Sequence, residues 1–137
     1  RLDGTVQRTR VLDPVSRNRR AWSDYWPRWQ WSADLRRDKG AWAFGAHADD
    51  RGDFRFFRVD EVDENFNTGP WVSLFAEYRP DRRTTLRIDA KNVTEASGSR
   101  KRWFSAPNRA APAPWLLEKR DRNNHVGLVF SLSRSFG

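Results

Sequence analysis

The chain has 137 residues, enough to form one modest domain, and it contains no cysteine, which excludes a disulfide framework, a zinc–thiolate cluster and thiol catalysis. Its net charge of +8 comes from arginines scattered over the whole length, without a zinc finger, an RNP-type motif or a helix-turn-helix pattern, so nucleic acid is not the expected partner. No run approaches the roughly 20 apolar residues of a membrane-spanning helix.

Large aromatic residues are abundant although the chain is polar as a whole. Only 37% of residues are hydrophobic, yet there are 8 Trp and 9 Phe. Burying tryptophan in a soluble core requires a partner for its indole N–H, whereas tryptophan at a membrane surface keeps one end dry and the other wet. The composition therefore favours membrane-spanning strands, which stay polar on one face.

Turn signals divide the chain into long strands. Short polar turns are predicted at 37–40 and 80–83, and reversals at 13–17, 65–70 and 107–114. The prediction is an all-β fold in one unit over 1–137, an antiparallel meander of about six long strands. The predicted strands lie near 1–12, 18–36, 41–61, 70–79, 84–105 and 114–136.

Apolar residues alternate with polar ones on both sides of the two short turns. Because alternate side chains of a strand point to opposite faces, each strand has one apolar face near its short turn. Outer-membrane barrels have this pattern, with short periplasmic turns and longer polar extensions outside. The residues predicted to face lipid are Trp29, Trp31, Leu35, Trp42, Phe44, Val72, Leu74, Tyr78, Leu86, Ile88, Leu128, Phe130 and Leu132.

The last strand carries a second signal. Its apolar residues alternate with Gly127, Ser131 and Ser133, and it ends in an aromatic residue. Such a strand suits the wall of a transmembrane β-barrel.

Several segments resemble the C-terminal region of TonB-dependent outer-membrane receptors. The resemblance runs over nearly the whole chain and is strongest from Phe57 to Phe136. It rests on Arg58-Val-Asp-Glu61, Gly69-Pro-Trp-Val-Ser-Leu-Phe-Ala-Glu77, Leu86-Arg-Ile-Asp-Ala-Lys-Asn-Val-Thr-Glu95, Arg100-Lys-Arg-Trp-Phe104 and the terminal strand, together with Asp13-Pro14-Val15 and Arg19.

The resemblance implies a barrel of about 22 strands with a plugged lumen, located in the outer membrane of a Gram-negative cell. Its function is uptake of a scarce nutrient of the siderophore, cofactor or carbohydrate class. Six strands cannot close such a wall, so the resemblance implies that the chain forms the C-terminal part of a large transmembrane β-barrel, the last part of a receptor. It also implies an assembly signal in the last strand, at Leu128, Phe130, Leu132 and Phe136, that the barrel-assembly machinery reads. The implied partners are the rest of the barrel and its plug, the TonB system reached through preceding sequence, the assembly machinery, and outer-membrane lipid with lipopolysaccharide.

No constellation of residues indicates an enzyme, a cofactor or a metal site. His47 and His125 lack a second histidine or a cysteine nearby and are interpreted as polar wall residues. The acidic stretch 60–64 lacks the spacing of an EF-hand and is interpreted as an outer loop. Aromatic and basic residues near the outer strand ends are the candidates for ligand contact, since they suit anionic ligands and sugars. They are Trp22, Tyr25, Trp26, Arg102, Trp103 and Trp115.

Two alternatives remain open from the sequence. One is a small soluble β-barrel that binds a ligand inside and points its apolar residues inward. The other is a basic β domain that binds nucleic acid in a salt-sensitive manner.

Overall fold

The computed structural model describes residues 1–22 and 26–136, and within them the fold is all-β. No helix in this part of the chain has the length and hydropathy needed to cross a membrane. The strands are β1 (Leu2–Val6), β2 (Val11–Leu12), β3 (Arg19–Arg20), β4 (Trp29–Lys39), β5 (Trp42–Arg51), β6 (Phe54–Phe57), β7 (Glu61–Asn67), β8 (Trp71–Tyr78), β9 (Thr84–Lys91), β10 (Gly98–Phe104), β11 (Leu116–Arg122) and β12 (Gly127–Arg134).

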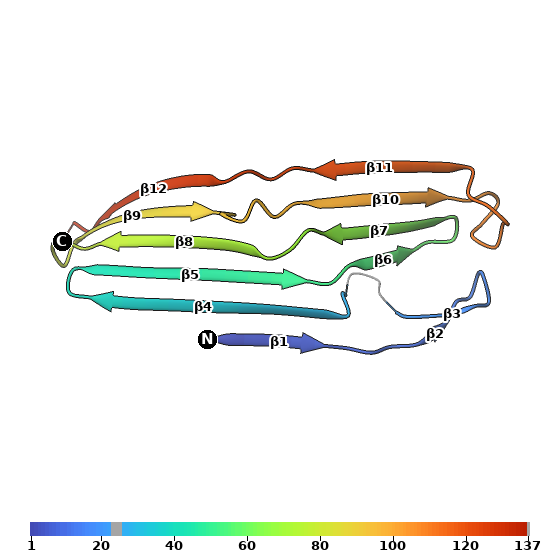
Figure 1. Ribbon diagram of the computed structural model, residues 1–137, viewed down its shortest axis with the longest axis horizontal. Coiled ribbons are helices and arrows are strands. Elements are labelled where there is room, and N and C mark those ends of the chain that lie inside the picture. Colours follow the sequence, from blue (N-terminus) through green and yellow to red (C-terminus); the bar gives the residue numbers. More distant parts are fainter. Residues whose placement is uncertain (23–25, 137) are drawn as a thin grey trace.

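The strands join end to end in pairs, which gives six long strands in an antiparallel meander (Figure 1). The halves nearest the C-terminus form a six-stranded sheet in the order β1-β4-β5-β8-β9-β12. The other halves form a sheet of order β11-β10-β7-β6 and the small pair β2-β3. Substantial contacts between the described strands are those between hydrogen-bonded neighbours, so the structure is one layer thick.

The six-stranded sheet does not close on itself. Its outer strands, β1 and β12, each have one neighbour among the described residues, β4 and β9 respectively. The predicted antiparallel meander is therefore confirmed, while the described chain forms an open sheet.

Both short turns form, but the first is tighter than predicted: residues 37–39 continue strand β4, and the chain reverses at Gly40 and Ala41, at the end of the predicted 37–40. Gly40, with φ of 60°, follows β4, and the register pairs Lys39 with Trp42 directly across that turn. Glycine accepts this left-handed conformation without strain. Between β8 and β9, the Asp81 carboxylate accepts hydrogen bonds from the backbone N–H of Arg83 and Thr84 at 2.7 and 2.8 Å.

One predicted reversal is misplaced. The chain turns back at Arg58–Asp60, where the Arg58 N–H donates to the Glu61 carbonyl at 2.9 Å, and not at 65–70. Gly69, with φ of 124°, and Pro70 interrupt a long strand that runs from β7 into β8. The predicted strands 41–61 and 70–79 thus become 42–57 and 61–78, because a Gly-Pro pair can break a ladder without reversing the chain.

The remaining long strands are also interrupted near their middle. Asn92, between β9 and β10, is fully buried with φ of 55°. Its side-chain N–H₂ donates to the carbonyls of Ala96 and Asn124, each at 3.1 Å, and its Oδ1 accepts from the Ala96 N–H at 2.8 Å. One asparagine side chain therefore ties the break in the β9–β10 strand to the break in its neighbour.

We expect Asn92→Ala to lower the free energy of unfolding by about 2–4 kcal/mol, because it leaves buried carbonyls and an N–H unsatisfied and places a Cβ residue at positive φ. Asn92→Gly restores the backbone freedom but not the hydrogen bonds, so it should recover only part of the loss. Denaturant unfolding followed by tryptophan fluorescence measures both, with the exposed Asn123→Ala as control. Equal stability of all three variants would contradict this role for Asn92.

Candidate functional site: a sheet with an apolar and a charged face

The strand register gathers the predicted lipid-facing residues on one face of the six-stranded sheet. Residues directly opposite on neighbouring strands point the same way. Ala46 stands opposite both Leu35 and Leu74, and Ala90 stands opposite both Leu74 and Leu128. A second row runs from Trp42 through Tyr78 and Leu86 to Leu132. Each of the predicted residues shares this parity, which defines the apolar face.

The apolar face is exposed. Leu35 is 72% exposed, Phe130 74% and Leu132 70%. Trp42 packs along this face against Tyr78, with ring centroids 4.6 Å apart, and is stacked on Phe44 at 5.8 Å. Exposed apolar side chains thus neighbour one another from β4 to β12, whereas a soluble protein usually exposes such residues singly.

The opposite face, which we call the charged face, is built around Glu77. This glutamate is 6% exposed and forms ion pairs with Arg79, Arg36 and Arg87. Arg87 also pairs with Asp89 at 2.7 Å. Fork-shaped guanidinium groups can serve two carboxylates at once, so the charges are held in place across β4, β8 and β9.

Phe75 lies within this charged network. The guanidinium carbon of Arg87 is 4.1 Å from its ring centroid and that of Arg36 is 5.5 Å away, both within the range of cation–π attraction. Gly45 makes room for the ring, because a side-chain carbon at that position would overlap it. The Phe75 ring therefore lies close to the backbone of β5 at Gly45 and near the guanidinium groups of Arg36 and Arg87.

Burial in this structure is the reverse of that in a soluble domain. Among the described residues, the buried apolar side chains are only the small ones of Pro27, Ala43 and Ala96, whereas Asp13, Glu61, Asp63 and Glu77 are buried carboxylates. Carboxylates are rarely buried in a soluble domain unless they are paired. The charged face is therefore the more enclosed side of the sheet, and the apolar face is the more open one.

Paired carboxylates continue along the halves of the long strands that lie away from the short turns, which we call the outer halves. Asp63 of β7 pairs with Arg100 of β10, and Glu61 pairs with Arg102 at 2.6 Å. The hydrogen bond from Arg102 lowers the pKa of Glu61, and that from Arg100 lowers the pKa of Asp63, in each case against the effect of burial. The interpretation of 60–64 as an acidic outer loop is wrong, because most of the stretch is strand β7 and arginines of β10 neutralise it.

A buried carboxylate also ties three turns together at the outer end. Asp13, fully buried, accepts hydrogen bonds from the backbone N–H of Val15 and Ser16 and pairs with Arg20 at 2.6 Å and Arg109 at 2.9 Å. Both guanidinium groups lie over the Phe57 ring, at 3.9 and 5.3 Å. This outer clamp joins the β2–β3 turn, the end of β6 and the β10–β11 loop.

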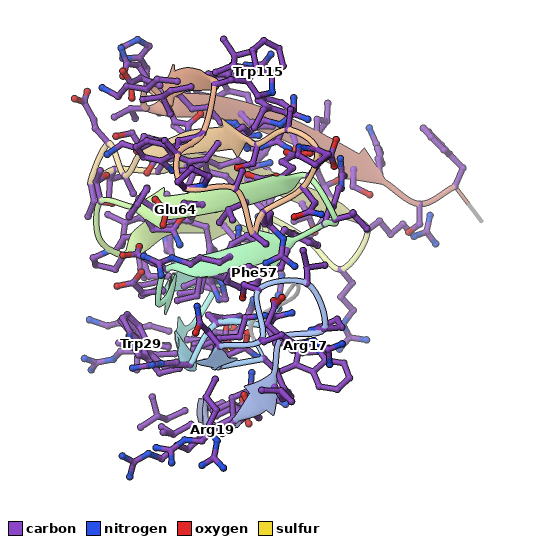
Figure 2. The ribbon with its side chains drawn as sticks, turned by 90° about the vertical axis from the view of Figure 1, so that its right-hand side faces the viewer. Arg17, Arg19, Trp29, Phe57, Glu64 and Trp115 are labelled. Atoms are coloured by element: carbon purple, nitrogen blue, oxygen red, sulfur yellow. The ribbon has the colours of Figure 1, made fainter. Side chains whose placement is uncertain are left out.

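The end view places Phe57 between the two edges of the molecule, with Arg19 toward one edge and Trp115 at the other (Figure 2). The predicted ligand-contact residues are accordingly not gathered into one group. Arg102 and Trp103 are consecutive in β10 and point to opposite faces, with the Trp103 indole N–H 3.3 Å from a Glu64 carboxylate oxygen. Trp115 is 67% exposed, and Tyr25 lies outside the described residues.

Trp22 and Trp26 do share a surface feature, a hollow of about 830 Å³ between the segments that follow β1 and β3. The charged residues that line it are Arg8, Arg10, Arg19, Arg20 and Arg28. The sequence reasoning missed these arginines as a group because it treated the arginines as evenly scattered. Their density between residues 8 and 28 was the available signal.

The histidines gain no chemical role. His47 lies on the charged face, with Nδ1 2.8 Å from Asp34 and Nε2 3.3 Å from Asp49. His125 lies exposed between β11 and β12. Within residues 1–22 and 26–136, no group of three or more His, Asp or Glu side chains is arranged to hold a metal ion.

The outer clamp should make stability depend on pH. Burial alone would raise the pKa of Asp13, but the hydrogen bonds from Arg109, Ser16, Arg20 and Val15 outweigh it and lower that pKa well below its usual range. The clamp is therefore at full strength above about pH 4 and weakens as pH falls below that value.

We expect Asp13→Asn to lose about 3 kcal/mol at pH 7, because two guanidinium groups lose a buried partner. The loss should shrink on acidification, since the wild-type carboxylate is itself weakened there. Unfolding free energies measured from pH 7 to pH 3 give the comparison, with the exposed Asp121→Asn as control. A loss that does not change with pH would rule out the charge as its cause.

In comparisons with family models, curated proteins and solved structures, nothing matches this chain.

Proposed function

We propose that this chain forms part of the wall of an outer-membrane β-barrel, in a transporter of the TonB-dependent receptor class. The observation that carries the proposal is the combination of an exposed apolar face with a more enclosed charged face across the same six strands. Lipid covers the apolar face, and the charged face lines a watery or plugged lumen.

The arrangement along the strands supports the same placement. The apolar rows occupy β4, β5, β8, β9 and β12, next to the short turns, while the outer halves carry the paired charges of Glu61, Asp63, Arg100 and Arg102. A lipid layer of fixed thickness favours a band of this kind on every strand. In a soluble barrel the apolar face would turn inward, and nothing in the burial pattern favours that alternative.

The unpaired edges of β1 and β12 support a larger wall. Unsatisfied N–H and C=O groups are costly in lipid, so in this proposal further strands of the barrel pair with both edges. A plug and the TonB system are the partners that the resemblance implies, and the cargo is a scarce nutrient. The proposal asks the chain only to form a stretch of barrel wall, so no cofactor and no catalytic step are part of it.

A single residue on each face of β12 tests the medium around the sheet. Phe130 is 74% exposed, so in water Phe130→Asp should change stability by no more than about 0.5 kcal/mol. Facing lipid, an acidic residue costs up to roughly 2 kcal/mol, somewhat less than a basic one. The matched control is Ser131→Asp, which stands opposite Arg87 on the charged face. We expect folding into lipid vesicles to be weakened only by the first variant; equal behaviour contradicts a lipid-facing Phe130.

The topology is tested with single cysteines, since the natural chain has none. Lys39 and Arg82 lie at the short turns, and Asp60 and Ala110 lie at the opposite ends of the long strands. With an impermeant thiol reagent on intact cells, we expect labelling at 60 and 110 but not at 39 or 82. Opening the outer membrane should then expose all four. Labelling of all four positions before opening would be incompatible with a membrane wall.

A further inference from the structure

The hollow at the N-terminal edge of the structure is strongly basic. It is lined by Arg8, Arg10, Arg19, Arg20 and Arg28, and its lining contains no acidic residue among those described. Arg20 is held by Asp13 at 2.6 Å. The other arginines are exposed and form no ion pair with a described carboxylate, unlike the arginines that face Glu61, Asp63 and Glu77. Positive charge is thus left available in this hollow.

Hydrogen bonds fix the frame of the hollow at both ends. Near β1 and β4, the Gln7 N–H donates to the Arg28 carbonyl at 2.8 Å, and the Gln7 side chain donates to the Pro27 carbonyl at 2.9 Å. Toward the outer end, Thr9 exchanges two hydrogen bonds with the backbone of Trp22, at 2.9 and 3.0 Å. The arginines therefore project from two segments held at a set spacing.

The hollow adjoins the end of the apolar face. Val6 and Trp29, which are paired across β1 and β4 and belong to the apolar face, also line the hollow. Trp22 and Trp26, 55% and 61% exposed, stand beside the arginines. Exposed tryptophan at the limit of an apolar surface is typical of the level of lipid headgroups, and planar guanidinium groups bind phosphate through paired hydrogen bonds.

We propose that this hollow binds the phosphate groups of a phosphorylated lipid headgroup whose acyl chains lie on the adjacent apolar face. The proposal rests on the membrane placement above and names the partner of one surface within it. The continuity with Val6 and Trp29 favours a lipid over a free phosphate compound, since a soluble ligand gains nothing from that apolar border.

The test measures binding of a labelled diphosphorylated glucosamine lipid to the full-length protein in neutral detergent micelles. Removing Arg8, Arg10 and Arg19 together by substitution with Gln should weaken binding about a hundredfold, at roughly fivefold for each charge. The control carries the same charge change at the opposite end, in Arg37→Gln, Arg82→Gln and Arg83→Gln, and should bind like the wild type. The dephosphorylated lipid should bind the wild type as weakly as the first variant binds the phosphorylated one.

Three results would overturn the proposal: equal weakening by both triple variants, equal binding of the dephosphorylated lipid, or binding of free pyrophosphate as tight as that of the lipid. A replacement of the same three residues by Lys keeps the charge but not the paired hydrogen bonds, so it should bind more tightly than the Gln variant and less tightly than the wild type, which separates misfolding from loss of binding. Failure of the membrane placement would appear instead in the Phe130 and cysteine measurements, which do not involve these arginines.

Discussion

Side chains that stand opposite each other on antiparallel strands point to the same side, so the register of the six-stranded sheet decides what each face presents. A slip of one residue between β5 and β8 would place Phe75 and Glu77 among Leu35, Trp42 and their neighbours. Since the sheet is a single layer, no second layer could conceal the error. The separation of apolar and charged side chains is therefore a property of strand pairing, and every functional inference depends on it.

The charged face reinforces that register. Glu77 of β8 forms ion pairs with Arg87 of the adjacent strand β9 and with Arg36 of β4, which lies beyond β5, so its ion pairs reach across four neighbouring strands. Each pair is worth little when exposed to water, but a carboxylate that is 6% exposed has few other partners. Glu77 and its arginines therefore neutralise each other on the enclosed face. They also make other strand registers unfavourable, because a shifted register would leave these charges without partners.

The alternation of apolar residues and the short turns were predictable from sequence, because a period of two and a Gly or Pro at a tight reversal are local signals. The turn at Arg58–Asp60 was not, since it contains neither Gly nor Pro and no apolar alternation flanks it. The acidic stretch from Asp60 to Glu64 was misinterpreted for a related reason: its neutralising partners, Arg100 and Arg102, come from about 40 residues away in the sequence.

The outer clamp shows the same limit more clearly. Asp13 in the sequence indicates a local turn, and the structure shows that turn, with the Asp13 carboxylate accepting hydrogen bonds from the N–H groups of Val15 and Ser16. Its ion pair with Arg109, however, joins residues 96 positions apart. The basic hollow was also hidden, because its arginines alternate with other residues in sequence and converge only when the segments after β1 and β3 lie side by side. Local patterns thus predicted the antiparallel meander, whereas the contacts between its distant turns became visible only in the fold.

The interruptions of the long strands have a consequence for how such a sheet can change. On β9 the charged face carries odd-numbered residues such as Arg87 and Asp89, while on β10 the paired charges are the even-numbered Arg100 and Arg102. The same change of parity separates β11 from β12, with Glu118 on one side and Val129 on the other. An insertion or deletion beyond a break is therefore absorbed there, and the outer half can diverge in length and sequence while the inner half keeps its alignment.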